Sequence, residues 1–346
     1  MKSCILNRTI LAMCAVALSA LSASAQPVAS DPDLRAWFKA DDLLKSGVAP
    51  GSYISQWKDA SSYGTILAPR TTMNPGGPGL GKPVEEAPTL VLSDINGRQI
   101  PTLRFDRAGD VVGGSGDPAV PGSGAADRLY QTNNLAPNFD PLNIGDGTSL
   151  TAIVVFFPDY TTTSALGYQP VLAKRGPSSS VWELGINNTA GPAGGRLNYV
   201  TYDAQTEYLS GKKIAEKKWH VSGLTITDDP ASPADALGFW DNDSMSTTGR
   251  MINLGNVPTG TTVSRNPTTP EPFGIGGHSQ TCCGEGETFA GNIAEVIVYS
   301  RVLTPTELEG VESYLGQKYF GVPEPSSATL LGFGLLALAR RARRSR

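Results

Sequence analysis

The carboxylates are the first residues to test for chemistry, because two of them can cleave a glycosidic bond. A retaining mechanism places the two carboxyl groups about 5–5.5 Å apart, and acids at positions i and i+4 of one strand point to the same face. No strand-like segment carries such a set. Glu285 and Glu287 lie in a glycine-rich stretch without a third acid, and Glu295 is expected at a sheet edge or facing solvent. The sequence therefore predicts that the chain is not an enzyme.

Histidine and cysteine are scarce, with 2 His and 4 Cys in 346 residues. His220 is expected to cap or pack at the start of a strand. His278 lies near Cys282 and Cys283, but three ligands within six residues rarely form a tetrahedral site, so zinc is not expected. In an oxidising compartment the two adjacent cysteines can close a vicinal disulfide. The alternative is a pair of reduced or separately oxidised thiols.

Calcium is the one metal that the sequence suggests, because it prefers carboxylate and carbonyl oxygens. Asp241 and Asp243 follow a strand that ends at Trp240, and residues 140–146 form a second acidic loop. The alternative is that these residues are ordinary turn formers. Three aromatic residues are candidates for stacking on sugar rings or for the core: Tyr202, Tyr208 and Trp240.

Both ends of the chain are predicted to lie outside the fold. Residues 1–25 combine a basic start, an apolar stretch and a small-residue cleavage site, as in a secretory signal peptide. The C-terminal segment 323–346 places a short apolar run before five arginines in its last seven residues. The run is shorter than a relaxed membrane span, and the arginines hold its end on the cytoplasmic side. The alternative for this segment is a permanent anchor.

The tail also carries a short motif before its apolar run: Val322, Pro323, Glu324 and Pro325. Together, the motif, the apolar run and the arginines resemble the PEP-CTERM sorting signal of Gram-negative bacteria. The resemblance implies an exosortase-type membrane peptidase as a partner, transient anchoring at the inner membrane, and release to the cell envelope or exterior.

The segment between the ends is acidic. Seven of the 28 basic residues and one of the 32 acidic residues lie at the two ends, so residues 26–322 hold 21 basic and 31 acidic residues, a net charge of −10. Nucleic acid is not expected as a partner, because its phosphates require clustered Lys and Arg.

The middle segment predicts an all-β fold. About eleven short strand candidates alternate with Gly, Pro, Asn and Asp clusters, which is typical of two packed antiparallel sheets. Residues 150–157 are long and β-branched, as in a central strand. Residues 70–88 and 107–147 are expected to be loop insertions. One helix is predicted at the end of the domain, with Thr304 as N-cap and Glu307 completing a capping box.

The opening and closing parts of the middle segment resemble those of LamG-like, concanavalin A-type domains. The similarity lies in residues 37–43, 55–59 and 103–106 and in the closing stretch 289–308. It implies a jelly-roll sandwich over residues 26–322, in which calcium is often held at the sheet rim. Glucanases of this fold carry Glu-x-Asp-x-x-Glu, which is absent from this sequence.

These features predict an exported, non-catalytic binding or matrix protein that associates with extracellular polysaccharide. Two alternatives stay open. One is a glycan-active hydrolase or lyase of the same fold with a non-standard site, and the other is a purely structural envelope protein.

Overall fold

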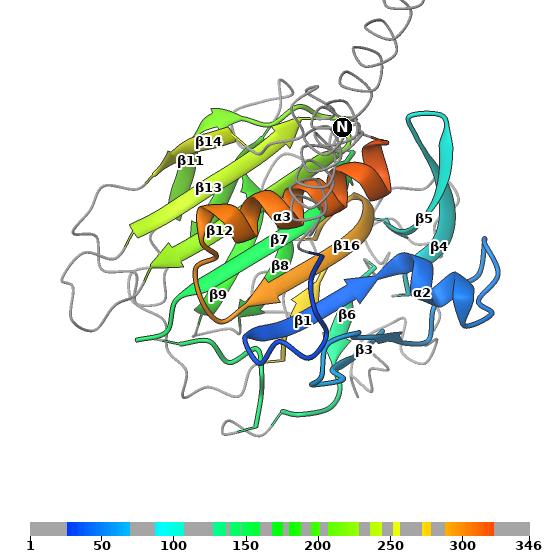
Figure 1. Ribbon diagram of the computed structural model, residues 1–346. Helices are drawn as coiled ribbons and strands as arrows, with labels where there is room; N and C mark the ends of the chain where they lie inside the picture. Colours follow the sequence, from blue (N-terminus) through cyan, green and yellow to red (C-terminus); the bar gives the residue numbers. More distant parts are fainter. Residues whose placement is uncertain are drawn as a thin grey trace, which may run out of the picture.

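The computed structural model is a sandwich of two antiparallel eight-stranded sheets (Figure 1). The residues that the structure describes are 26–69, 87–106, 127–135, 139–145, 147–159, 168–175, 180–187, 195–200, 207–227, 236–243, 252–256, 272–277 and 288–321. In each sheet a late strand lies between earlier ones: β16 pairs with β7 and β5 in one sheet, and β15 pairs with β8 and β6 in the other.

Sheet A contains the longest strands and the C-terminal strand. Its order is β14 (Ile252–Asn256), β13 (Ala236–Asp243), β12 (His220–Thr227), β7 (Leu150–Pro158), β16 (Gly291–Tyr299), β5 (Arg98–Phe105) and β4 (Thr89–Ile95), with β1 (Leu34–Lys39) paired to β16. The register is continuous along β12, since His220 pairs with Phe156 of β7 and Asp243 of β13.

Sheet B faces sheet A across the core. Its order is β11 (Glu207–Lys213), β10 (Arg196–Val200), β9 (Ser180–Asn187), β8 (Tyr168–Arg175), β15 (Gly274–Ile275), β6 (Leu129–Gln131), β3 (Ile66–Ala68) and β2 (Trp57–Lys58).

Two apolar clusters explain why these strands form layers. Along β7, Leu150, Val154 and Phe156 point between the sheets, whereas Ile153 and Val155 point to the outer face of sheet A. A strand that is apolar on both faces must be covered on both. The inner cluster is the sandwich core, and the outer cluster requires a third layer.

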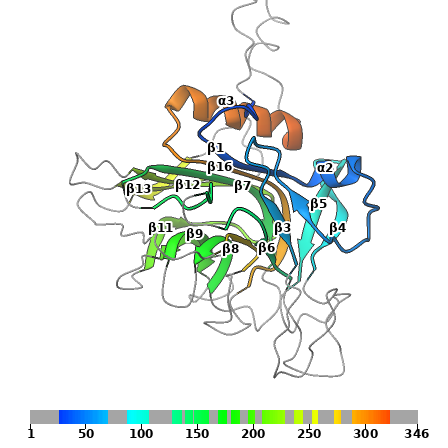
Figure 2. The same ribbon diagram turned by 90° about the horizontal axis from the view of Figure 1, so that it is seen from below.

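The C-terminal helix provides that third layer. Helix α3 (Pro305–Leu315) lies across the outer face of sheet A and continues as the π-helix η1 (Gly316–Phe320) (Figure 2). The predicted capping box is present: Thr304 Oγ1 accepts from the Glu307 N–H at 3.4 Å, and the Glu307 carboxylate accepts from the Thr304 N–H at 2.9 Å. Val311 and Leu315 pack into the outer cluster.

The predicted all-β jelly-roll sandwich with a C-terminal helix is confirmed, and several local expectations were wrong. A short helix α2 (Ala40–Lys45) follows β1, and β6 lies within the expected insertion 107–147. Four strands have no counterpart among the expected ones: β3, β4, β11 and β14. Strand β6 has only three residues, which is too short for periodicity to reveal. The expected signal peptide and tail helix lie outside the described residues.

Candidate functional site

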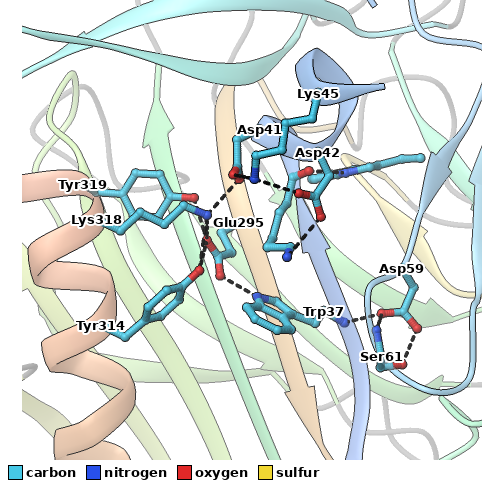
Figure 3. Close-up of polar contacts among 12 residues, drawn as sticks. Trp37, Asp41, Asp42, Lys45, Asp59, Ser61, Glu295, Tyr314, Lys318 and Tyr319 are labelled. Carbon is cyan, nitrogen blue, oxygen red and sulfur yellow. Dashed lines mark hydrogen bonds and ion pairs between the residues drawn. The ribbon is translucent and has the colours of Figure 1, made fainter. Parts of the chain in front are cut away.

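The outer face of sheet A is closed by a buried polar network around Glu295. This side chain projects from β16 toward α3 and η1, where its carboxylate accepts hydrogen bonds from Trp37 Nε1 at 2.5 Å, Tyr319 Oη at 2.6 Å and Lys318 Nζ at 2.7 Å (Figure 3). Glu295 is 1% exposed, so the expectation of a sheet-edge or solvent-facing residue was wrong. The apolar neighbours on its face had indicated a covered surface.

Lys318 extends this network to the surface. Its Nζ also donates to Asp41 Oδ1 at 2.8 Å, and Lys45 donates to the same carboxylate at 2.6 Å (Figure 3). Burial would raise the pKa of Asp41, but the hydrogen bonds from Lys318 and Lys45 outweigh it and lower that pKa. Burial, together with the Glu295 charge, raises the pKa of Tyr319. Every group in the network has a partner, so it stabilises the helix on the sheet and presents no free acid.

The outer face of sheet B has a different character. Leu172, Leu184 and Leu197 point into the core, so the alternate positions on their strands point outward. This face extends from β8 to β11 through three cross-strand pairs of outward residues: Ala173–Glu183, Gly185–Asn198 and Asn198–Leu209. The outward side chains with polar or small groups on these strands are Tyr168, Ala173, Arg175, Glu183, Asn187, Asn198 and Glu207.

Glu207 organises one end of this face. Its carboxylate accepts from Asn187 Nδ2 at 2.6 and 2.7 Å and from Asn198 Nδ2 at 2.7 Å. Asn198 Oδ1 is buried and has no hydrogen-bond partner among the described residues. It lies over Gly185, where an added Cβ would come within 2.6 Å of it. The arrangement offers a fixed carboxylate and an amide oxygen that can still accept a hydrogen bond.

A buried ion pair lies beside this polar set. Arg175 Nη1 is 3.3 Å from Glu183 Oε2, and the Arg175 guanidinium lies 5.9 Å from the centre of the Tyr168 ring. The pair neutralises both charges in a site of low exposure. Sequence analysis singled out none of these face residues, although the period-2 alternation of polar and apolar residues in β9 and β10 contained the signal.

Asp241, one of the two expected calcium ligands, points between the sheets. Its carboxylate lies 3.0 Å from His220 Nδ1 and also accepts from Ser222 Oγ. His220 Nε2 donates to the Ala215 carbonyl at 2.7 Å. A calcium ion would have to replace these partners, and the side chain of Asp243 lies outside the described residues. A calcium site at Asp241 and Asp243 stays a prediction.

The second acidic loop is occupied in a similar way. Asp140 pairs with the buried Lys174 Nζ at 2.5 Å and accepts from Gln131 Nε2 at 3.1 Å. No group of three or more His, Cys, Asp or Glu that would hold a metal ion is found within the described ranges. These two acidic loops therefore use their first carboxylates for internal contacts.

Two of the aromatic residues expected to stack on sugar rings pack against the apolar clusters instead. Tyr208 packs against the inner core, and Trp240 packs in the outer cluster of sheet A with its Nε1 donating to Thr225 at 3.1 Å. Several other expected residues lie outside the described part of the chain: Tyr202, His278, Cys282, Cys283, Glu285, Glu287, Val322, Pro323, Glu324 and Pro325. The vicinal disulfide and the sorting motif residues stay predictions.

The comparison with family models identifies the C-terminal segment. Residues 321–344 match the PEP-CTERM protein-sorting motif, which confirms the predicted sorting signal with slightly shifted limits. The motif implies export to the envelope or exterior through exosortase sorting. In the described residues no helix has the length and apolar character to cross a membrane. No curated protein matches the sequence.

Solved structures with a similar arrangement share little sequence with this chain. A Trypanosoma rangeli sialidase in complex with the inhibitor DANA is 14% identical over 89% of this chain and 38% of that chain, with a TM-score of 0.45. Domain 4 of AbnA, a GH43 extracellular arabinanase from Geobacillus stearothermophilus, is 13% identical over 81% and 98%, with a TM-score of 0.41. An arabinofuranosidase is 8% identical over 84% and 60%, with a TM-score of 0.48. This chain therefore spans well under half of the sialidase.

These comparisons correct one prediction. The expectation that this chain is not an enzyme does not stand, since structures with a similar arrangement include ones described as a sialidase, an arabinofuranosidase and a domain of an arabinanase; this likeness concerns the fold alone. The physical reason is that the missing Glu-x-Asp-x-x-Glu run excludes one arrangement of acids on a single strand. Carboxylates contributed by different strands can also form a pair, and a motif within one strand does not detect them.

Proposed function

We propose that this chain is an exported protein whose sandwich binds an extracellular polysaccharide through the outer face of sheet B. The observation that carries the proposal is the polar set of Asn187, Asn198 and Glu207. These side chains are fixed by one another, and the amide oxygen of Asn198 has no partner within the described residues. Sugar hydroxyls both donate and accept hydrogen bonds, so they match the exposed carboxylate of Glu207, which the buried Asn198 holds in place.

The opposite face does not support the same role. Helix α3 covers it, and the Glu295 network beneath the helix leaves no unmatched group. A polysaccharide chain is long and needs an extended surface with side chains in repeated positions. The antiparallel strands β8 to β11 supply one, since each outward residue has a neighbour on the next strand.

The test is retention of the full chain on immobilised polysaccharide from a bacterium that carries the exosortase pathway. Glu207→Gln and Asn198→Ala should weaken retention, and Glu309→Gln is the matched control because Glu309 is an exposed glutamate on α3. No retention of the wild-type chain on any such polysaccharide would overturn the proposal. Equal losses in all three variants would place binding elsewhere.

The tail supplies the sorting step of the proposal. Residues 1–25 direct secretion, and the segment 323–346 holds the protein at the inner membrane until an exosortase-type peptidase cuts near Pro325. Residues 326–339 span about 21 Å as a helix, which is less than the ~30 Å hydrocarbon core and suits transient insertion. Glu324→Ala should leave insertion unchanged and block release. Mass spectrometry that finds residues 340–346 on protein in the medium would contradict this step.

A second candidate, a glycan hydrolase, is favoured by one feature of the same face. Glu183 of β9 and Glu207 of β11 both point to this face, and β10 lies between their strands. Strands two positions apart in a sheet are separated by about 9.6 Å. Inverting hydrolases hold their two carboxyl groups about 6.5–9.5 Å apart. Release of reducing ends by the wild-type chain, lost in Glu183→Gln, would support hydrolysis, and binding without such release would exclude it.

A further inference from the structure

Arg128 occupies an unusual position on the outer face of sheet B. It immediately precedes β6, where Leu129 points into the core, so Arg128 and Tyr130 point to the outer face. β6 belongs to the same sheet as β8 to β11, and β15 joins the two groups of strands. Arg128 therefore shares a face with Asn198 and Glu207 and is only 4% exposed.

The charge of Arg128 is not matched by the described residues. Its Nε is buried without a hydrogen-bond partner, and no described carboxylate forms an ion pair with its guanidinium. Arg175 on the same face provides the contrast, because Glu183 neutralises it. An uncompensated buried charge is strongly destabilising, so a partner that arrives with a ligand is the physical explanation.

The backbone is shaped to hold this side chain. The stem of Arg128 lies against Gly277, where an added Cβ would come within 2.7 Å of Cδ and 3.0 Å of Cγ. Gly276 beside it has a φ of 82°, a conformation that favours glycine. A side chain at Gly277 would displace the stem of Arg128, whereas an added Cβ at Gly276 would instead meet Phe105 at 2.4 Å. This is a built position rather than a chance exposure of one arginine.

We infer that Arg128 receives a carboxylate of the bound polysaccharide, so that the ligand is an acidic glycan containing uronate-type sugars. The inference rests on the proposed function of the sheet B face. A guanidinium donates to a carboxylate through two parallel N–H groups, and its two Nη atoms form such a pair. The Nε of Arg128 is sealed from solvent, so the ligand carboxylate reaches the guanidinium from its Nη side.

The surrounding charges favour a singly charged group. Asp127 adjoins Arg128 in the chain and accepts the Asp106 N–H at 2.8 Å, and Asp106 pairs with Arg104 at 2.8 Å. A carboxylate cancels the single charge of Arg128. A phosphate monoester carries about −1.5 to −2 near neutral pH and would leave excess negative charge beside these aspartates.

The test compares affinities of the full chain for polygalacturonate and for an uncharged glucan. Arg128→Gln should weaken polygalacturonate binding about 10–100-fold and leave glucan binding unchanged, because it removes a charge-assisted pair. Arg98→Gln is the matched control, an exposed arginine on sheet A, and should stay within twofold. Arg128→Lys keeps the positive charge but loses the planar guanidinium, so its affinity for polygalacturonate should lie between those of wild type and Arg128→Gln. This variant replaces Arg128→Gln in the test if Arg128→Gln does not fold.

The outcomes separate the two claims. No binding of the wild-type chain to either polymer overturns the proposed function. Binding to polygalacturonate that is equal in wild type and both Arg128 variants overturns the inference alone. Arg128-dependent binding of dextran sulfate or of a phosphorylated polymer, with none to polygalacturonate, overturns the assignment of a carboxylate. Protection of wild type from thermal unfolding by free galacturonate, absent in Arg128→Gln, is the supporting result.

Discussion

The two outer faces of this sandwich are built from the same strand geometry and differ in how their polar groups are satisfied. On sheet A the carboxylate of Glu295 is buried, but four donors from β1, α3 and η1 surround it: Trp37, Tyr314, Lys318 and Tyr319. On sheet B, Asn198 Oδ1 and Arg128 Nε are buried without partners among the described residues. Under the proposed function, a bound ligand supplies the missing partners on sheet B, whereas sheet A supplies its own.

The largest effect is expected from breaking the closed face. Glu295→Ala leaves Lys318 and two tyrosine hydroxyls without their shared acceptor under the helix. Removing one partner of a buried ion pair costs about 3–5 kcal/mol, so the free energy of unfolding should fall by that amount. Chemical denaturation measures it. Glu309→Ala on the exposed side of α3 is the control and should stay within about 0.5 kcal/mol. Equal losses in the two variants would show that the network does not hold the helix.

A smaller effect, on binding rather than stability, is expected on the open face. Asn198→Ala removes the unpaired acceptor and one donor that holds Glu207, and should weaken polysaccharide binding by up to about tenfold, since one neutral hydrogen bond contributes about 0.5–1.5 kcal/mol. Stability should change little, because one buried acceptor without a partner disappears. Isothermal titration and thermal unfolding measure the two effects. A large loss of stability with unchanged affinity would reverse the assignment.

A substitution at the N-cap of α3 tests how much the packing of this helix on sheet A depends on its local capping contacts. Thr304→Ala removes the acceptor for the Glu307 N–H and should lower the free energy of unfolding by about 1 kcal/mol. Polysaccharide affinity should be unaffected, because α3 lies on the other face. Thr306→Ala is the control, because Thr306 is an exposed threonine in the first turn of the same helix, two residues after Thr304. Lost affinity in Thr304→Ala would mean that the two faces are coupled.

The smallest effect is a pH dependence at the same cap. Hydrogen bonds from Arg301 and Thr304 lower the pKa of Glu307 to about 2. A lowered folded-state pKa contributes stability above the unfolded value near 4.5, and that stability is lost as the pH falls toward 2. The side chain is 40% exposed, so screening reduces the contribution to below about 1 kcal/mol. Glu307→Gln should flatten the unfolding curve between pH 4.5 and 2 relative to wild type. An unchanged slope would contradict this origin.

The sequence predicted the layers better than the site. Residues 150–157 and the capping box at Thr304 carry strong local signals, so β7 and α3 were located from composition and spacing alone. Glu295 was misjudged because its partners come from positions 37, 314, 318 and 319. The apolar neighbours on its face indicated a covered surface, but the donors that make burial of the carboxylate possible are brought to it only by the packing of the helix.

The binding face was missed for a related reason. Asn187, Asn198 and Glu207 come from three strands and form no motif in the chain, since their proximity is created by the register of β9, β10 and β11. No sequence motif marks Arg128 as a candidate binding residue either. The inference about it depends on its burial, on the glycine turn at 276–277 and on the lack of a partner within the described residues. Motifs along one strand are readable from sequence, and constellations across strands are not.

The most direct test of the account compares the protection of the segments around two glutamates with and without the polysaccharide. Glu207 lies on the outer face of sheet B, and Glu309 lies on α3 above sheet A; both are exposed. Hydrogen–deuterium exchange of the full chain, read by mass spectrometry, should show the segment around Glu207 protected by saturating polygalacturonate and the segment around Glu309 exchanging equally in both samples. Protection of the segment around Glu309 with no change around Glu207 would contradict the assignment of the binding face to sheet B.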